Sequence, residues 1–260
     1  MQSMQNKVVL ITGAGTGMGA AALRRFAAAG AEVVATGRTR ATLEAVVAEI
    51  RATGGRAQYV VADVGTESGA RTALDFVAAT CGGLDVLINN ASVGWSHEQV
   101  LPGSMAATAD SPPGPWREVI RINLESVHLM CHCAIPLFRK RGGGAIVNVS
   151  SVGGTRGMAD AHAYAAAKAG VINLTRSLAK TYGPENIRSN CFAPGVVDTG
   201  MIDPYREMFD QAFADPVAAQ QICPLGRMGT PEEAADCMFF LAVATYCNGS
   251  VLVMDGGSSA

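Results

Sequence analysis

The stretch SSVGGTRGMADAHAYAAAK, residues Ser150–Lys168, joins a short apolar segment to a long alanine-rich one. The preceding segment, GGGAIVNV (Gly142–Val149), is an apolar run after a glycine cluster, which predicts a buried strand. The sequence from about Ala161 to Tyr182 is rich in alanine and is followed by Gly183-Pro184, which predicts a helix with a defined end. A buried strand followed by a helix is typical of an α/β fold.

Three polar residues of this stretch form a candidate catalytic set. Tyr164 and Lys168 are four residues apart on the predicted helix, so they share one face. Ser151 follows the predicted strand, at the edge where open α/β sheets bind their ligands. A nearby ammonium lowers the pKa of a phenol from its ordinary value of about 10. The set predicts acid–base chemistry on an alcohol or ketone, although Tyr164 and Lys168 taken alone also suit an ordinary helix surface.

Length and composition restrict the class of protein. The 260 residues are 49% hydrophobic and 16% charged, which predicts a single domain over residues 1–260 with a large core. The net charge of −2, without a basic run, argues against a nucleic-acid partner. We expect no signal peptide and no membrane segment, because the chain has no apolar run of the required length. Seven scattered cysteines fit free thiols in the cytoplasm.

The N-terminal region predicts a dinucleotide site. Lys7–Thr12 is a predicted strand, GAGTGMG follows it, Met18–Ala29 is a predicted helix and Glu32–Thr36 is a second strand. Glycines at such a turn let a diphosphate approach the N–H groups of the helix N-terminus. The glycines are at positions 13, 15, 17 and 19, and Met18 replaces the third glycine of the general G-x-G-x-x-G fingerprint. A simple tight strand–helix junction remains the alternative interpretation.

The end of the second predicted strand bears on the choice of dinucleotide. An acidic residue at this position would bind the ribose hydroxyls of NAD, but the sequence is Thr36-Gly37-Arg38. The Arg38 guanidinium suits a 2′-phosphate, so NADP(H) is favoured and NAD(H) remains possible. A solvated arginine at a helix start is the alternative interpretation.

Two further strand ends carry polar residues. Ala57–Ala62 is a predicted strand that leads into Asp63-Val64, where the carboxylate is placed to accept a hydrogen bond from the adenine amino group. Leu84–Ile88 leads into Asn89-Asn90-Ala91, whose side chains suit loop backbone groups and the adenosine. Plain turn chemistry would explain both.

The remaining segments are expected to shape the substrate site and the surface. Residues 92–115 lack periodicity and form a predicted loop, and residues 200–221 have apolar residues at roughly helical spacing; both are assigned to the substrate. Further strands are predicted over Asn186–Phe192 and Gly249–Met254, and a helix over Pro231–Ala244.

Trp116–Arg141 is predicted to be one long helix. Its cluster His128, Cys131, His132 and Cys133 faces several directions, so a packed or interface helix is favoured over a metal site.

Taken together, these motifs resemble the short-chain dehydrogenase/reductase family in its form of about 250 residues, over essentially the whole chain. Thr12–Gly19 (TGAGTGMG) has that family's T-G-x-x-x-G-x-G spacing. Ser151, Tyr164-x-x-x-Lys168 and the late Asp255-Gly256-Gly257 also follow in the family's order. Ser92 is a departure, because the family usually has glycine after Asn-Asn-Ala.

The resemblance implies a fold and a role for each matching residue. The fold would be a doubly wound, Rossmann-type α/β/α structure with a parallel sheet of about seven strands. Tyr164 would be the general acid/base, Lys168 would lower its pKa and bind the nicotinamide ribose, Ser151 would orient the substrate and Asn123 would hold a relay water. The implied cofactor-binding residues are Gly13, Gly15, Thr16, Gly17, Met18, Gly37, Arg38, Asp63, Val64, Asn90, Ala91, Tyr164, Lys168, Pro194, Gly195, Val197 and Thr199.

These expectations define a predicted function. The protein would be an NADP(H)-preferring oxidoreductase that interconverts a secondary alcohol and a ketone by hydride transfer. An NAD-dependent alcohol dehydrogenase of the same family is the main alternative, and a non-catalytic dinucleotide-binding sensor is a minor one. The resemblance further implies a homotetramer or homodimer that acts on a small carbonyl or alcohol substrate.

Overall fold

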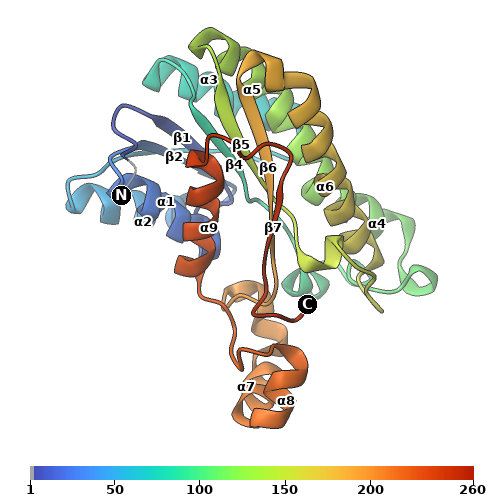
Figure 1. The fold of residues 1–260 in the computed structure, drawn as a ribbon. Helices are drawn as coiled ribbons and strands as arrows, with labels where there is room; N and C mark the ends of the chain where they lie inside the picture. Colours follow the sequence, from blue (N-terminus) through green and yellow to red (C-terminus); the bar gives the residue numbers. More distant parts are fainter. Residues whose placement is uncertain (1–2) are drawn as a thin grey trace.

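The computed structural model describes residues 3–260, in which one parallel sheet lies between two layers of helices (Figure 1). Across the sheet the strands follow the order β3-β2-β1-β4-β5-β6-β7, so the winding direction reverses between β1 and β4. This confirms the predicted doubly wound fold and places a ligand crevice at the carboxyl ends of the central strands. The strands are β1 (Val8–Thr12), β2 (Glu32–Gly37), β3 (Arg56–Val61), β4 (Val86–Asn89), β5 (Gly144–Val149), β6 (Ile187–Pro194) and β7 (Val251–Met254).

Alternating side chains of the strands bury both faces of the sheet. Val9 and Ile11 of β1 pack toward α1 (Gly17–Ala28), α2 (Arg40–Ala52) and α9 (Pro231–Val243). Val8 and Leu10 pack toward the opposite layer, which consists of α3 (Glu67–Cys81), α5 (Ser126–Arg141) and α6 (His162–Tyr182). A sheet covered on both faces needs continuous apolar strands, as the sequence has here.

The predicted strands agree with the structure except in their ends, and two helices were missed. Each of the seven predicted strands is present, with its ends displaced by no more than two residues. Helices α2 and α3 were not predicted. The sequence of α2 nevertheless indicates a helix, because its apolar residues have the spacing of one helical face. These are the buried Leu43, Val46, Val47 and Ile50.

The predicted helix Trp116–Arg141 is wrong in two respects. It begins three residues earlier, at Pro113, because proline suits the first turn of a helix. It is also interrupted, since α4 (Pro113–Ile120) passes into a π-helical turn, η3 (Arg121–Glu125), before α5 begins. In that turn the Ser126 N–H donates to the Arg121 carbonyl, five residues back. The wider turn shifts the register of every later residue.

The two predicted substrate segments contain short helices. Residues 92–115 hold the 3₁₀ turns η1 (Trp95–Gln99) and η2 (Thr108–Asp110). Residues 200–222 form η6 (Gly200–Tyr205), α7 (Arg206–Ala214) and α8 (Pro216–Ile222), and Pro216 ends α7. Helices α7 and α8 lie apart from the sheet, at the bottom of Figure 1. Within residues 3–260, no helix is both long and apolar enough to cross a membrane.

Candidate active site

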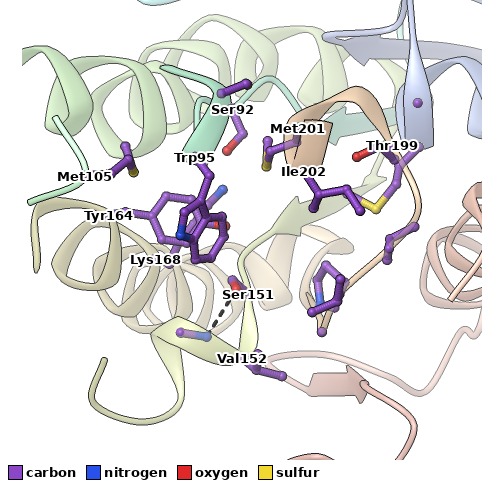
Figure 2. A pocket seen from close by; sticks show the side chains of 18 of the residues that line it. Ser92, Trp95, Met105, Ser151, Val152, Tyr164, Lys168, Thr199, Met201 and Ile202 are labelled. Atoms are coloured by element: carbon purple, nitrogen blue, oxygen red, sulfur yellow. Dashed lines mark hydrogen bonds between the residues drawn. The ribbon is translucent and has the colours of Figure 1, made fainter. Parts of the chain in front are cut away.

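A cavity of about 1100 Å³ lies at the carboxyl ends of the central strands (Figure 2). It brings together most of the predicted site residues, from five separate parts of the chain. Those on its wall are Gly13, Thr16, Gly17, Met18, Asn90, Ala91, Ser151, Tyr164, Lys168, Pro194, Gly195, Val197 and Thr199. The other predicted residues, Gly15, Gly37, Arg38, Asp63, Val64 and Asn123, lie outside the wall.

The connection between β5 and α6 holds the candidate catalytic set in place. Ser151 lies two residues beyond the end of β5, and its Oγ accepts the Gly153 N–H at 3.1 Å across the short turn η4 (Val152–Gly154) (Figure 2). Ser150 Oγ donates to the Lys168 carbonyl at 2.8 Å, which fastens the strand end to the helix. A Cβ on Gly154 would lie 2.6 Å from the Lys168 backbone, so glycine is needed for this close packing. Backbone contacts therefore set the spacing between Ser151 and Lys168.

Tyr164 and Lys168 are almost completely buried. The Lys168 Nζ lies 5.5 Å from the centre of the Tyr164 ring and donates to the Val149 carbonyl at 3.0 Å. Burial lowers the pKa of Lys168 to about 8, because a buried ammonium loses its hydration. Burial also raises the pKa of Tyr164, while the neighbouring Ser151 lowers it. The net direction for Tyr164 is opposite to the one expected from the neighbouring ammonium.

Asn123 lies behind the cavity wall. Its side chain is fully buried in η3, where Oδ1 accepts the Ser92 hydroxyl at 2.6 Å and the Val93 N–H at 3.1 Å. Its Nδ2 donates to the Val93 carbonyl at 3.1 Å. The side chain therefore fastens the loop after β4, with Ser92 adding a bond that glycine could not make. The relay-water role of Asn123 stays a prediction.

The glycine turn after β1 has the form that a dinucleotide diphosphate requires. Gly13 has a φ of +62°, and a Cβ on it would lie 2.8 Å from the Ala91 Cα. A Cβ on Gly19 would lie 2.3 Å from the Gly13 carbonyl oxygen, so the turn and the start of α1 are in direct contact. The N-terminus of α1 lines the cavity through Gly17 and Met18, and free N–H groups at a helix N-terminus bind anions. The turn therefore fits the diphosphate of NAD(P).

Asn90 and Thr12 support this turn from below. Asn90 Nδ2 donates to the carbonyls of Thr12 and Gly13, at 3.0 and 3.2 Å. Thr12 Oγ1 accepts the N–H groups of Asn90 and Ala91, at 3.0 and 2.9 Å. Asn90 thus holds the turn as well as lining the cavity. Thr12 is a supporting residue that the sequence did not single out.

The segment after β6 closes the cavity against the glycine turn. A Cβ on Gly17 would lie 3.1 Å from Thr199 Cγ2, so the helix start and this segment lie side by side. Gly195 donates its N–H to the Met254 carbonyl at 2.8 Å, and a Cβ on it would lie 2.8 Å from Asp255. The late Asp255-Gly256-Gly257 motif therefore supports the segment that contains the implied cofactor-binding residues Pro194, Gly195, Val197 and Thr199.

The end of β2 lies beside the glycine turn. The Ala14 N–H donates to the Thr36 carbonyl at 3.3 Å, and Gly15 packs against Thr42 of α2. Arg38 follows β2, is exposed and forms no ion pair with any described residue. The contact of Arg38 with a 2′-phosphate stays a prediction.

Asp63 is held beside Arg121. Its Oδ1 accepts the Gly65 N–H at 3.0 Å, and its Oδ2 lies 3.4 Å from Arg121 Nη1. Arg121 also pairs with Glu118 at 2.7 Å, so Asp63 belongs to a small charge network. Val64 is buried. The adenine contact predicted for Asp63 remains a prediction.

The substrate side of the cavity is largely apolar. Trp95 lies over the Tyr164 ring, with 5.6 Å between the two ring centres (Figure 2). A Cβ on Gly94 would lie 2.6 Å from Met201 Sδ, so the loop after β4 packs directly on η6. Sequence reasoning did not identify Trp95, because nothing in its spacing indicates a contact with Tyr164. Other apolar wall residues are Met105, Val152, Met158, Ile202, Met208 and Phe209.

The His/Cys cluster of α5 does not converge. His128 and His132 lie on the exposed face with 6.2 Å between ring centres, whereas Cys131 is buried and accepts a hydrogen bond from Asn89. Across residues 3–260 no three potential metal ligands are grouped. The seven cysteines are free thiols.

Comparisons with known proteins agree with the family that the sequence motifs resemble. Residues 13–259 match the family described as "Enoyl-(Acyl carrier protein) reductase". The chain is 38% identical to cis-4-hydroxycyclohexanecarboxylate dehydrogenase of Sinomonas cyclohexanicum, covering 100% of this chain and 99% of the relative. It is 36% identical to a 3-oxoacyl-[acyl-carrier-protein] reductase of Thermotoga maritima, over 98% of both chains. The crystal structure of levodione reductase has a TM-score of 0.88 at 34% identity, over 98% of both chains.

The chain therefore belongs to the short-chain dehydrogenase/reductase family, as its motifs predicted. It is an NAD(P)-dependent oxidoreductase that acts on CH–OH and C=O groups of a small molecule.

Proposed function

We propose that this protein interconverts a secondary alcohol and a ketone, prefers NADP(H), and uses Tyr164 as its general acid/base. The observation that carries the proposal is the placement of Ser151, Tyr164 and Lys168 on the wall of one cavity with the glycine turn. When bound, the nicotinamide supplies or accepts the hydride. The protein residues then handle the proton and the orientation of the substrate.

Tyr164 protonates the carbonyl oxygen during reduction and removes the hydroxyl proton during oxidation. Ser151 donates a hydrogen bond to the same oxygen and holds it beside the phenol. Lys168 binds the ribose hydroxyls of the nicotinamide half and places a positive charge near the Tyr164 ring, 5.5 Å from its centre. Tyr164 is only 5% exposed and lines the cavity, so the substrate would reach it from that cavity.

The rest of the cofactor would bind along the glycine turn and the strand ends. Gly13 to Met18 would hold the diphosphate, Pro194 to Thr199 the carboxamide, and Asp63 with Val64 the adenine. Arg38 would pair with the 2′-phosphate, which is the basis for preferring NADP(H). Its exposure and lack of an ion-pair partner among the described residues support this role.

The cofactor preference is tested by titrating NADPH and NADH into the wild-type protein and the Arg38→Ala variant. We expect NADPH to bind at least about tenfold tighter, a margin of about 1.4 kcal/mol, and expect the variant to lose it. Equal or tighter binding of NADH would contradict the preference and favour the NAD-dependent alternative. Cofactor binding without turnover of any carbonyl compound would favour the sensor.

The apolar wall supports a compact cyclic substrate. Trp95 covers Tyr164, and Met105, Met158 and Met201 surround the remaining space. Relatives that resemble this chain include cyclohexanol dehydrogenase of Acinetobacter sp., at 35% identity over 96% of this chain and 94% of the relative. A ring-sized ketone is therefore the substrate that we would test first.

We also propose a single-domain, cytoplasmic protein that forms a homotetramer or homodimer. Free cysteines support the compartment. Exposed apolar residues near the C-terminus support self-association: Phe240 is 51% exposed and Val253 is 39% exposed. Size-exclusion chromatography with light scattering would give the number of subunits.

A further inference from the structure

The cavity wall contains two cationic side chains, Lys168 and Arg156, within the described part of the chain. Lys168 is buried beneath Tyr164 and donates to the Val149 carbonyl. Arg156 is exposed and lines the cavity from the loop between η4 and α6, so it stands at the rim, on the same loop as Met158 of the apolar wall. The role of Arg156 follows neither from the acid–base chemistry nor from the cofactor motifs.

The Arg156 guanidinium is held in position but not neutralised. Its Nη1 donates to the Ser258 carbonyl at 2.8 Å, and Asp255 in turn accepts the Ser258 hydroxyl at 3.2 Å. No described carboxylate lies within ion-pair distance of Arg156. A guanidinium has five N–H donors in a planar fork, so most remain free for an anion. An anchored cation also loses less conformational freedom when it binds a ligand.

The distance between Ser151 and Arg156 is short enough for a small substrate to contact both residues. It is five residues beyond Ser151, which sets an upper limit of about 18 Å between the two backbone positions. The 3₁₀ turn Val152–Gly154 shortens that separation, since it rises only about 2 Å per residue. A ring-sized substrate together with the arginine side chain spans such a distance.

Two acidic residues also lie on the cavity wall, and neither neutralises Arg156. The Glu98 carboxylate accepts the N–H groups of Gly103 and Met105, both at 2.7 Å, so its own loop uses it. Asp160 is exposed, lies four residues beyond Arg156, and is not within ion-pair distance of it. Its negative charge would oppose an anionic ligand at the same rim.

We propose that Arg156 binds a carboxylate carried by the substrate at the end remote from the reacting carbon. The preferred substrates are then hydroxy acids and oxo acids in which a compact apolar ring or chain separates the carboxylate from the CH–OH or C=O group. The apolar wall takes the ring, Ser151 and Tyr164 take the oxygen, and Arg156 takes the carboxylate. This inference rests on the proposed function, because it uses the same catalytic cavity.

The test compares two ketones of similar size, 4-oxocyclohexanecarboxylate and the neutral 4-methylcyclohexanone, with NADPH. For the wild-type protein we expect a higher kcat/KM with the oxo acid. In Arg156→Gln this preference should fall by about tenfold, mainly through KM, while the neutral ketone is unaffected. Asp160→Asn, a matched change of opposite sign at the same rim, should increase the preference. An unchanged ratio in Arg156→Gln, or equal losses for both ketones, would overturn the proposal.

A binding measurement separates this proposal from the proposed function. Calorimetric titration of the NADPH-loaded protein with cyclohexanecarboxylate requires no turnover, and we expect binding that Arg156→Gln weakens about tenfold. If neither ketone is reduced but this Arg156-dependent binding is seen, the proposed reaction fails and the anion site stands. If 4-methylcyclohexanone is reduced but cyclohexanecarboxylate does not bind, the anion site fails and the reaction stands.

Discussion

The nucleotide side and the substrate side of the cavity are built from different kinds of contact. On the nucleotide side, Gly13 and Gly19 meet backbone: a Cβ on Gly19 would lie 2.3 Å from the Gly13 carbonyl oxygen. On the substrate side, Gly94 meets the flexible side chain of Met201, whose sulfur would lie 2.6 Å from an added Cβ. Backbone cannot move without disturbing the sheet, whereas a methionine changes rotamer at little cost. The turn that binds the cofactor is therefore rigid, whereas the wall that selects the substrate can adjust.

The largest effect is expected where an added methyl meets backbone. In Gly19→Ala the gain in helix propensity is at most about 1 kcal/mol, and overpacking costs about 1–3 kcal/mol. Because the clash involves the turn that holds the diphosphate, we expect a lower Tm and at least 100-fold weaker NADPH binding. Gly157→Ala is the control, since an added Cβ there meets nothing within 4 Å. Equal Tm and affinity in both variants would show that the turn adjusts as freely as the substrate side.

Ser151 lies between the two sides and should have an intermediate effect. We expect Ser151→Ala to lower kcat by about 10²-fold, because the substrate oxygen loses a positioned donor. Ser151 lowers the pKa of Tyr164, so its removal should raise that pKa further. Alcohol oxidation needs the phenolate, and its rate rises with pH through the pKa of Tyr164. The rising limb of the kcat/KM profile should therefore move to higher pH, and a limb that stays or moves lower would contradict this.

A smaller effect is expected on the substrate side. Gly94→Ala should leave NADPH affinity unchanged and alter the KM for the ketone a few-fold, because Met201 can turn away from the added methyl. The double variant Gly94→Ala/Met201→Ala should restore the wild-type value, since it removes the conflict. A large loss of NADPH affinity in Gly94→Ala would show that the two sides are coupled.

The sequence predicted the parts of the molecule that depend on local pattern. Apolar runs identified all seven strands. Motif spacing predicted that Ser151, Tyr164 and Lys168 lie together, and all three lie on one cavity wall. The π-helical turn at Arg121–Glu125 was not predictable, because Asn123 is held there by Ser92 and Val93, which are distant in the sequence.

The features that were not predicted from the sequence also arise from three-dimensional packing. The contact of Trp95 with Tyr164 joins residues of different segments. The raised pKa of Tyr164 follows from burial, and the neighbour that lowers this pKa is Ser151. Arg156 is held at the cavity rim by the carbonyl of Ser258, which lies 102 residues away in the sequence.

The most direct test of the central claim is the rate of NADPH-dependent ketone reduction by Tyr164→Phe, measured beside its affinity for NADPH. The substitution keeps a ring that packs against Trp95 and removes only the hydroxyl that would transfer the proton. We expect a loss of about 10²–10⁴-fold in kcat, with NADPH affinity within about twofold of wild type. A variant that keeps most of its turnover would contradict the assignment of Tyr164 as the general acid/base.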